Sequence, residues 1–297
     1  MLCTSVVLVL GPFQQMDGPF FCLRLMKISA TIITLNEEKH LARCLESISD
    51  VADEIVVVDS RSQDDTLEIA KQFHARMFTR DWTNYSEQKN YAASVATHDW
   101  ILSLDADECL SPALHKALQA VKQQHTDASA FAFPRKALYL GRWIEHSGWY
   151  PDHKTRLYRK DKARWNGAYV HESLHVEGLV ARLEGDLLHY SCESISEHLR
   201  SLDRYTTLAA QELWHRGKRG TLLRSVASAI AAFVKTYWLK QGFRDGMQGF
   251  LIACFSGYYN LAKYAKVWEL EQRDGAWENK GAQAIAAPPP RSKGSSP

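Results

Sequence analysis

The sequence predicts an α/β fold, with a mostly parallel sheet flanked by helices and a helical C-terminal region after it. Between residues 28 and 134, short apolar runs rich in β-branched residues alternate with stretches in which apolar residues recur every three or four positions. Strands and helices that alternate in this way form a parallel sheet with helices on both faces. After residue 193 only the helical spacing remains.

The expected elements follow one another along the first half of the chain. Strands are expected at residues 28–34, 54–59, 76–79, 100–104 and 128–134. Helices are expected between them, at residues 37–48, 64–73, 85–96 and 112–123. The run EIVVVD at 54–59 is typical of a buried strand, whereas Leu41, Leu45 and Ile48 share one face of a helix.

Composition divides the chain into four segments. Residues 1–25 are expected to be an extension that precedes the natural start, because a clean strand pattern begins only after Met26. An intact mass of the native protein that included those residues would refute this. Residues 26–192 form the expected α/β domain and 193–271 the helical region. Residues 272–297, which end in a Pro-, Ser- and Gly-rich run, are expected to be a disordered tail.

Charge is distributed unevenly, although the net charge is only +2. Residues 199–266 hold eleven Lys and Arg against three Asp and Glu, whereas residues 1–198 are net acidic. The basic segment at 199–266 is expected to face phosphate groups or anionic lipid. The alternative interpretation is a helical surface that only contacts solvent. The low net charge and the lack of a recognised module argue against nucleic-acid binding. Six scattered cysteines without a CxxC pair indicate reduced thiols in a cytosolic protein.

Polar residues follow three of the expected strands. Asn36 and Glu37 follow the first strand, Asp59 ends the second, and Asp105 and Asp107 follow the fourth. Because the carboxyl ends of parallel strands meet at one edge of a sheet, we expect these acidic groups to converge. Carboxylates repel one another when no cation is present. A divalent metal, Mg²⁺ or Mn²⁺, is therefore expected at this edge.

Each of these signals also has a purely structural interpretation. Asp105 and Asp107 lie two positions apart and face the same side of an extended segment, but they could also simply end a strand before Ser111 caps the next helix. Asn36 could be the N-cap of the first helix. Lys89, on the expected helix at 85–96, is either a surface lysine or a phosphate contact.

Four segments together resemble the donor-binding half of the family 2 glycosyltransferases, whose fold is the Rossmann-like GT-A fold. They are ATIITLNEE (30–38), EIVVVDSRSQDDT (54–66), QKNYA (88–92) and DWILSLDADE (99–108). The resemblance implies a UDP-sugar donor and seven donor-site residues, namely Thr34, Asn36, Glu37, Asp59, Asp65, Lys89 and Asp105. It implies that Asp105 and Asp107 form the metal-binding DXD motif and that Asp59 contacts the uridine. Lys89 stands where many relatives have arginine, so its bond geometry to the diphosphate differs.

The second half resembles bacterial members that build the lipopolysaccharide core. The resemblance rests on WNGAYVHE (165–172), LHYS (188–191) and RYT (204–206). It implies transfer of a hexose such as glucose to a lipopolysaccharide-core or other envelope glycan, linked to lipid. A polyprenyl-phosphate acceptor and a nucleotide-sugar binding protein without turnover are the alternatives. The absence of GxGxxG after the first strand argues against a dehydrogenase.

An inverting transfer needs a base for the acceptor hydroxyl and a positive group for the leaving diphosphate. Glu172 is the candidate base, with His171 beside it, and an ion pair with a nearby arginine is the alternative. Asp107 would act on the diphosphate through the metal. His189 is either a further metal ligand or diphosphate contact, or a core histidine.

Residues 222–265 mix apolar and aromatic residues with spaced cations, and no stretch reaches the roughly 20 apolar residues that a membrane span needs. We expect helices that lie in the membrane interface, with packing on the α/β domain or on a second copy as the alternative. The protein is then expected in the cytoplasm, peripheral to the anionic inner face of the cytoplasmic membrane. The sequence leaves the oligomeric state open.

Overall fold

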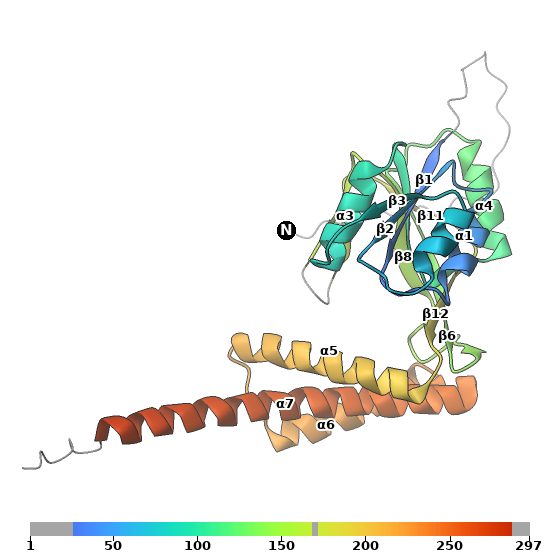
Figure 1. The fold of residues 1–297 in the computed structure, drawn as a ribbon. Helices are drawn as coiled ribbons and strands as arrows, with labels where there is room; N and C mark the ends of the chain where they lie inside the picture. Colours follow the sequence, from blue (N-terminus) through green and yellow to red (C-terminus); the bar gives the residue numbers. More distant parts are fainter. Residues whose placement is uncertain (1–25, 168–171, 287–297) are drawn as a thin grey trace, which may run out of the picture. The chain divides into compact units, whose positions relative to one another are not determined.

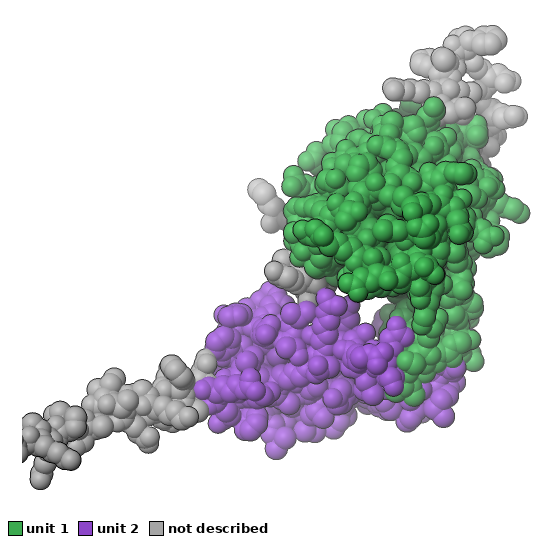
Figure 2. All heavy atoms as spheres, viewed as in Figure 1, with its two compact units in different colours: residues 1–195 green, residues 196–297 purple. Residues whose placement is uncertain are grey.

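The computed structural model describes residues 26–167 and 172–286. The expected extension at 1–25 and the end of the tail, from residue 287, lie outside the described residues. The chain forms two compact units, residues 1–195 and residues 196–297 (Figures 1 and 2). This division falls close to the boundary expected after residue 192.

The first unit is built on one large sheet. Within the described residues it has ten strands, with the order β3-β2-β1-β4-β8-β6-β12-β5 and with β7 and β11 paired to β6. The strands are β1 (Ile28–Thr34), β2 (Glu54–Asp59), β3 (Arg76–Thr79), β4 (Trp100–Asp105), β5 (Glu108–Leu110), β6 (Ala130–Tyr139), β7 (Arg142–Trp143), β8 (Asp152–Arg159), β11 (Val180–Arg182) and β12 (Leu187–Cys192). A separate hairpin pairs β9 (Ala163–Asn166) with β10 (Ser173–Val176).

The sheet is parallel on one side and mixed on the other. Strands β3, β2, β1 and β4 are parallel, which confirms the expected α/β class. Beyond them, β8 runs antiparallel to both β4 and β6, and β12 runs parallel to β6 and antiparallel to β5. Strands β6 and β8 are joined through a short connection that contains β7 and no helix, which suits an antiparallel pair.

Helices cover both faces of the parallel half, as Figure 1 shows. They are α1 (Leu41–Ile48), α2 (Thr66–Gln72), α3 (Tyr85–Val95) and α4 (Pro112–Lys122). The Oγ atom of Ser111 accepts a hydrogen bond from Leu114 N at 3.2 Å, so Ser111 caps α4 as expected. Asn36 is not the N-cap of α1, because the helix begins only after His40. Asn36 instead has a φ of 56° in the loop after β1.

The core explains the unbroken apolar run of β2, which is IVVV at 55–58. Val57 of β2 packs in a cluster with Leu41 of α1 and Leu114 of α4 on one face of the sheet. Val56 and Val58 pack on the other face with Ala92 of α3. Successive side chains therefore point to opposite faces, and both faces are buried. Each large aliphatic side chain buried in this way contributes about 1.5–3 kcal/mol.

The second unit is helical. Its elements are α5 (Ile195–His215), α6 (Leu222–Val234), the π-helical turn η1 (Lys235–Leu239), the 3₁₀ turn η2 (Gly242–Asp245) and α7 (Gly246–Ala286). Lys266 of α7 joins it to α5, since its Nζ lies 2.7 Å from Asp203 Oδ1 and 2.9 Å from Thr206 Oγ1. Helix α7 continues past the expected limit at residue 271. None of the described helices combines the length and apolar content that a membrane crossing requires.

Candidate active site

The loops after β1 and β2 are joined through Asp59, the last residue of β2. Asp59 is fully buried, and its Oδ1 accepts hydrogen bonds from Thr34 Oγ1 at 2.9 Å and from Ser62 Oγ at 2.5 Å. Its Oδ2 accepts from Ser62 N at 2.8 Å. Asn36 adds a second link, because its Oδ1 accepts from Gln63 N at 2.8 Å. Asp59 thus organises both loops, and its contact with uridine stays a prediction.

Glu37 and Asp65 take different positions in these loops. The backbone of Glu37 is fixed by a 2.8 Å hydrogen bond from its N–H to Thr66 Oγ1, and its side chain is half-buried. Burial, followed by the negative charges of Asp107, Asp105 and Asp64, raises the pKa of Glu37 to about 7. Asp65 is exposed at the N-terminus of α2. Negative charge therefore accumulates around Glu37.

The raised pKa of Glu37 predicts a pH-dependent stability. The folded protein keeps this proton up to about pH 7, whereas the unfolded chain releases it near the ordinary value of 4.5. Stability is therefore lost as the pH rises from about 4.5 to about 7. Glu37→Gln should raise Tm at pH 8, without divalent metal, on the order of 5 °C, and should leave Tm at pH 4.5 nearly unchanged. Thermal unfolding measures both, with the exposed Glu46→Gln as control; equal pH profiles for wild type and Glu37→Gln would contradict the prediction.

Lys89 is a buried cation at the centre of the site. Only 1% of its side chain is exposed, so it is not a surface lysine. Its Nζ lies 2.7 Å from Glu172 Oε1 and 2.8 Å from Asp105 Oδ1. The same atom lies 4.6 Å from the ring centroid of Trp165, a cation–π distance. Lys89 therefore brings together two residues that lie far apart in the sequence.

A second buried cation, Arg156 of β8, completes the surroundings of Asp105. Its Nη2 lies 2.5 Å from Asp105 Oδ2 and 2.7 Å from Oε1 of Glu108, which is fully buried. Burial opposes ionisation of Asp105, but Arg156 and Lys89 hold its pKa far below the usual range. Both oxygens of Asp105 are thus paired with cations.

Arg156 was not predicted as a site residue from the sequence. One signal was available, because Arg156 lies two positions before the aromatic Tyr158 in an extended segment and so shares its face. An arginine on a buried face of a sheet needs an acidic partner. Without knowledge of the pairing between β4 and β8, that partner could not be named.

Glu172 has one paired oxygen and one unpaired oxygen. Oε1 is held by Lys89, whereas Oε2 is buried and accepts no hydrogen bond from the described residues. The alternative interpretation of Glu172 was an ion pair with an arginine, and the structure shows an ion pair with Lys89. His171 lies outside the described residues. An unpaired carboxylate oxygen beside the other charged groups can accept a proton from a bound hydroxyl.

Asp107 and His189 form a second pair. Strand β12 runs antiparallel to β5 and places His189 opposite Glu108, directly after Asp107. His189 Nε2 lies 3.1 Å from Asp107 Oδ2, and both side chains are partly exposed. A carboxylate oxygen and an imidazole nitrogen suit a divalent cation such as Mn²⁺, and other positions would be left to phosphate or water.

The predicted metal ligands therefore fit a divalent cation only in part. Asp107 and His189 fit, whereas Asp105 is already neutralised by two cations. Within residues 26–167 and 172–286, no three or more His, Cys, Asp or Glu side chains are grouped so that they could hold a metal ion. The pKa of Glu37 is raised by burial first and then by the negative charges of Asp107, Asp105 and Asp64, so a cation among these carboxylates would relieve their repulsion.

The chain is similar in sequence to known proteins. The family model for glycosyl transferase family 2 matches residues 29–177. An uncharacterized glycosyltransferase of Rickettsia typhi is 32% identical over 255 residues, which cover 82% of this chain and 87% of the relative. The lipopolysaccharide core biosynthesis glycosyltransferase LpsC of Rhizobium meliloti is 29% identical over 251 residues, which cover 82% of this chain and 93% of LpsC.

Solved structures were also found. S. aureus TarS 1–349 in complex with UDP-GlcNAc has a TM-score of 0.42 and 16% identity, over 84% of this chain and 92% of that chain. Glucosyl-3-phosphoglycerate synthase from Mycobacterium tuberculosis, in complex with Mn²⁺, UDP and phosphoglyceric acid, has a TM-score of 0.32 and 23% identity. That match covers 39% of this chain and 44% of the synthase.

Proposed function

The chain belongs to glycosyltransferase family 2, and we propose that it transfers a hexose from a UDP-sugar, with inversion, to a lipopolysaccharide-core or other envelope glycan. The observation that supports this most directly is the cluster of Lys89, Asp105 and Glu172 at the carboxyl edge of the parallel strands. The similarity to LpsC over most of its length favours a glycan of the lipopolysaccharide core as acceptor.

The donor would lie across the loops that follow β1, β2 and β4. Thr34, Asn36, Glu37, Asp59 and Asp65 would surround the nucleotide. Lys89 would then place its positive charge near the diphosphate.

Asp107 and His189 would hold Mg²⁺ or Mn²⁺. When bound, the ion would supply positive charge for the leaving diphosphate. Glu172 would take the proton from the acceptor hydroxyl at its unpaired Oε2, because that oxygen accepts no hydrogen bond from the described residues.

Release of UDP from a panel of nucleotide sugars tests this function. With Mg²⁺ or Mn²⁺ we expect hydrolysis of one UDP-hexose, and a chelator should abolish it. Asp107→Ala should raise the metal concentration needed for half-maximal rate at least about tenfold, because it removes a ligand. Asp161→Ala, an exposed aspartate in the turn after β8, is the matched control and should leave this concentration unchanged.

Two outcomes would count against the proposal. Failure to bind any nucleotide sugar would contradict it outright. Metal-dependent binding without turnover, even with lipopolysaccharide-core acceptors present, would favour a nucleotide-sugar binding protein.

We also propose that the turn between α6 and α7 contacts an anionic membrane surface. Two of its large apolar side chains are exposed to solvent, Trp238 at 59% and Leu239 at 74%. Three exposed cations, Lys235, Lys240 and Arg244, lie in the same short segment. Exposed aromatic and aliphatic side chains among cations are typical of interfacial helices.

Flotation with phosphatidylglycerol vesicles tests this contact. The double variant Trp238→Ser/Leu239→Ser should reduce the floated fraction at least about tenfold, because each large apolar side chain contributes about 1.5–3 kcal/mol on burial. Met77→Ser, which removes an exposed apolar side chain from the first unit, is the control. Equal flotation of the double variant and wild type would contradict membrane contact at this turn.

A further inference from the structure

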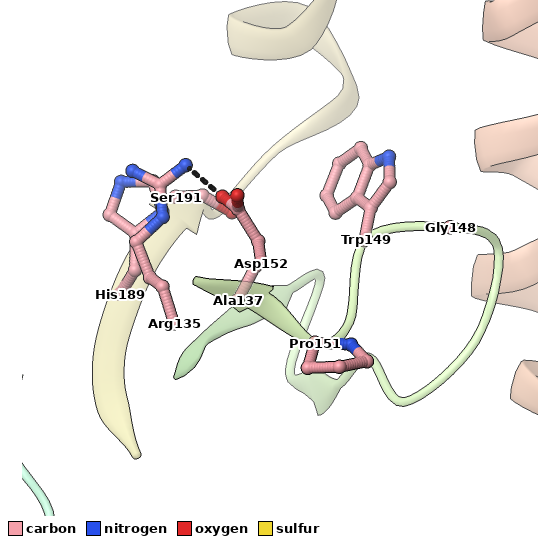
Figure 3. Close-up of a pocket in the computed structure, with 8 residues that line it drawn as sticks. All are labelled: Arg135, Ala137, Gly148, Trp149, Pro151, Asp152, His189 and Ser191. Atoms are coloured by element: carbon pink, nitrogen blue, oxygen red, sulfur yellow. Dashed lines mark hydrogen bonds and ion pairs between the residues drawn. The ribbon is translucent and has the colours of Figure 1, made fainter. Parts of the chain in front are cut away.

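A pocket of about 360 Å³ opens beside His189 in the first unit (Figure 3). Its volume lies within the roughly 300–1,000 Å³ of small-molecule sites. Six of the residues around it are Arg135 and Ala137 of β6, Trp149, Asp152 at the start of β8, and His189 and Ser191 of β12. None of the donor-site residues named above lines this pocket, whereas His189, the candidate metal ligand, does.

One side of the pocket carries a balanced pair of charges. Arg135 Nη2 lies 2.9 Å from Asp152 Oδ2, the bond drawn in Figure 3. Arg135 Nη1 also lies 3.5 Å from buried Glu108, and Lys154 Nζ lies 3.1 Å from Asp152 Oδ2. The guanidinium donates and the carboxylate accepts, so together they match hydroxyl groups, which do both. Because the charge of Arg135 is already compensated, the pocket favours a neutral polyol over a phosphate.

The other side carries an aromatic ring. Trp149 lies on the opposite side of Asp152 from Arg135 in the view of Figure 3. Its ring packs edge-on against buried Tyr139, with centroids 5.5 Å apart. Its backbone N–H donates to His146 O at 3.0 Å, which holds the loop in place. A fixed indole beside hydrogen-bonding groups suits a sugar ring, since the C–H face of the sugar packs on the aromatic face.

We propose that this pocket binds a neutral sugar residue of the glycan acceptor. The inference rests on the proposed function, because it assigns the acceptor side of the same site. His189 connects the two, since it lines the pocket and lies 3.1 Å from Asp107. A sugar held between Trp149 and the Arg135–Asp152 pair would thus lie next to the end of the site where the donor diphosphate is expected.

Saturation-transfer NMR with methyl hexosides at millimolar concentration tests the pocket without any turnover. Wild type should transfer saturation to the ring protons of at least one neutral methyl hexoside. Trp149→Ala and Asp152→Asn should reduce this signal at least about fivefold, and Trp149→Phe should keep most of it because a ring remains. Trp268→Ala, which removes an exposed tryptophan of α7, should change nothing.

Competition with UDP-glucose and with UDP distinguishes an acceptor sugar from the donor hexose as the ligand of this pocket. A signal that persists when UDP-glucose and metal saturate the donor site supports an acceptor subsite. Displacement by UDP-glucose but not by UDP would assign the pocket to the donor hexose and overturn the proposal. Equal signals in wild type and folded Trp149→Ala, or a stronger signal for glucose 6-phosphate than for methyl glucoside, would also overturn it. Because no turnover is measured, loss of UDP release in the earlier assay leaves this result unaffected.

Discussion

Replacing Glu172 by glutamine is expected to lower turnover about 10³-fold, within the 10²–10⁴-fold that a general base contributes. The amide keeps the size of the side chain but cannot take a proton at the position of Oε2, the buried oxygen without a hydrogen bond from the described residues. Binding of the UDP-sugar should change little, because Lys89 keeps Asp105 as its partner at 2.8 Å. Single-turnover kinetics with an acceptor, together with calorimetric titration of UDP, measure both quantities.

The comparison with Glu177→Gln isolates the role of Glu172. Glu177 is an exposed carboxylate directly after β10, so its replacement makes the same chemical change away from Lys89. Near-normal turnover of Glu172→Gln with intact UDP binding would remove Glu172 as the base. A loss confined to UDP binding would instead mean that Glu172 only positions Lys89, and the base would have to be sought elsewhere.

The parallel half of the fold could be predicted from the sequence because its signals are local. Strands β1, β2 and β3 have the expected bounds. The signal is clearest in β2, where Val56, Val57 and Val58 are buried on both faces of the sheet and form part of an uninterrupted apolar run. Strand β8, Asp152–Arg159, was not predicted. Five of its eight residues are charged or histidine, and it forms a strand because partners on other strands neutralise several of them.

The same distinction holds for the candidate site. The convergence of polar groups after β1, β2 and β4 follows from the geometry of parallel strands, so those residues could be proposed in advance. The burial of Lys89 could not, because its partner Glu172 lies 83 residues away. The pairing of both Asp105 oxygens with cations depends likewise on Arg156, 51 residues later. Spacing in the sequence indicated Asp105 and Asp107 as a metal-binding pair, whereas in the structure Asp105 is paired with two cations and Asp107 lies 3.1 Å from His189.

Replacing Arg156 by methionine is expected to destabilise the first unit by about 3–5 kcal/mol, the usual result of removing one partner of a buried ion pair. Arg156 is 4% exposed and Glu108 is fully buried, so water cannot take over the lost contact. Of the cations paired with them among the described residues, Glu108 would keep Arg135 at 3.5 Å and Asp105 would keep Lys89 at 2.8 Å. The unfolding temperature should fall on the order of 10 °C, at roughly 2–4 °C per kcal/mol for a unit of this size.

A second replacement distinguishes a lost ion pair from lost packing. Adding Glu108→Gln to Arg156→Met removes the uncompensated buried charge, and we expect it to recover at least about half of the lost stability. Arg159→Met, at the exposed end of the same strand, should change stability by less than about 0.5 kcal/mol, because its pair with Asp161 is open to solvent. If Arg156→Met and Arg159→Met shifted the unfolding temperature equally, the buried network would not stabilise the site. Recovery in the double variant would instead show that Arg156 stabilises the fold by compensating the buried charge of Glu108 beside the reacting groups, because that unpaired charge accounts for most of the loss.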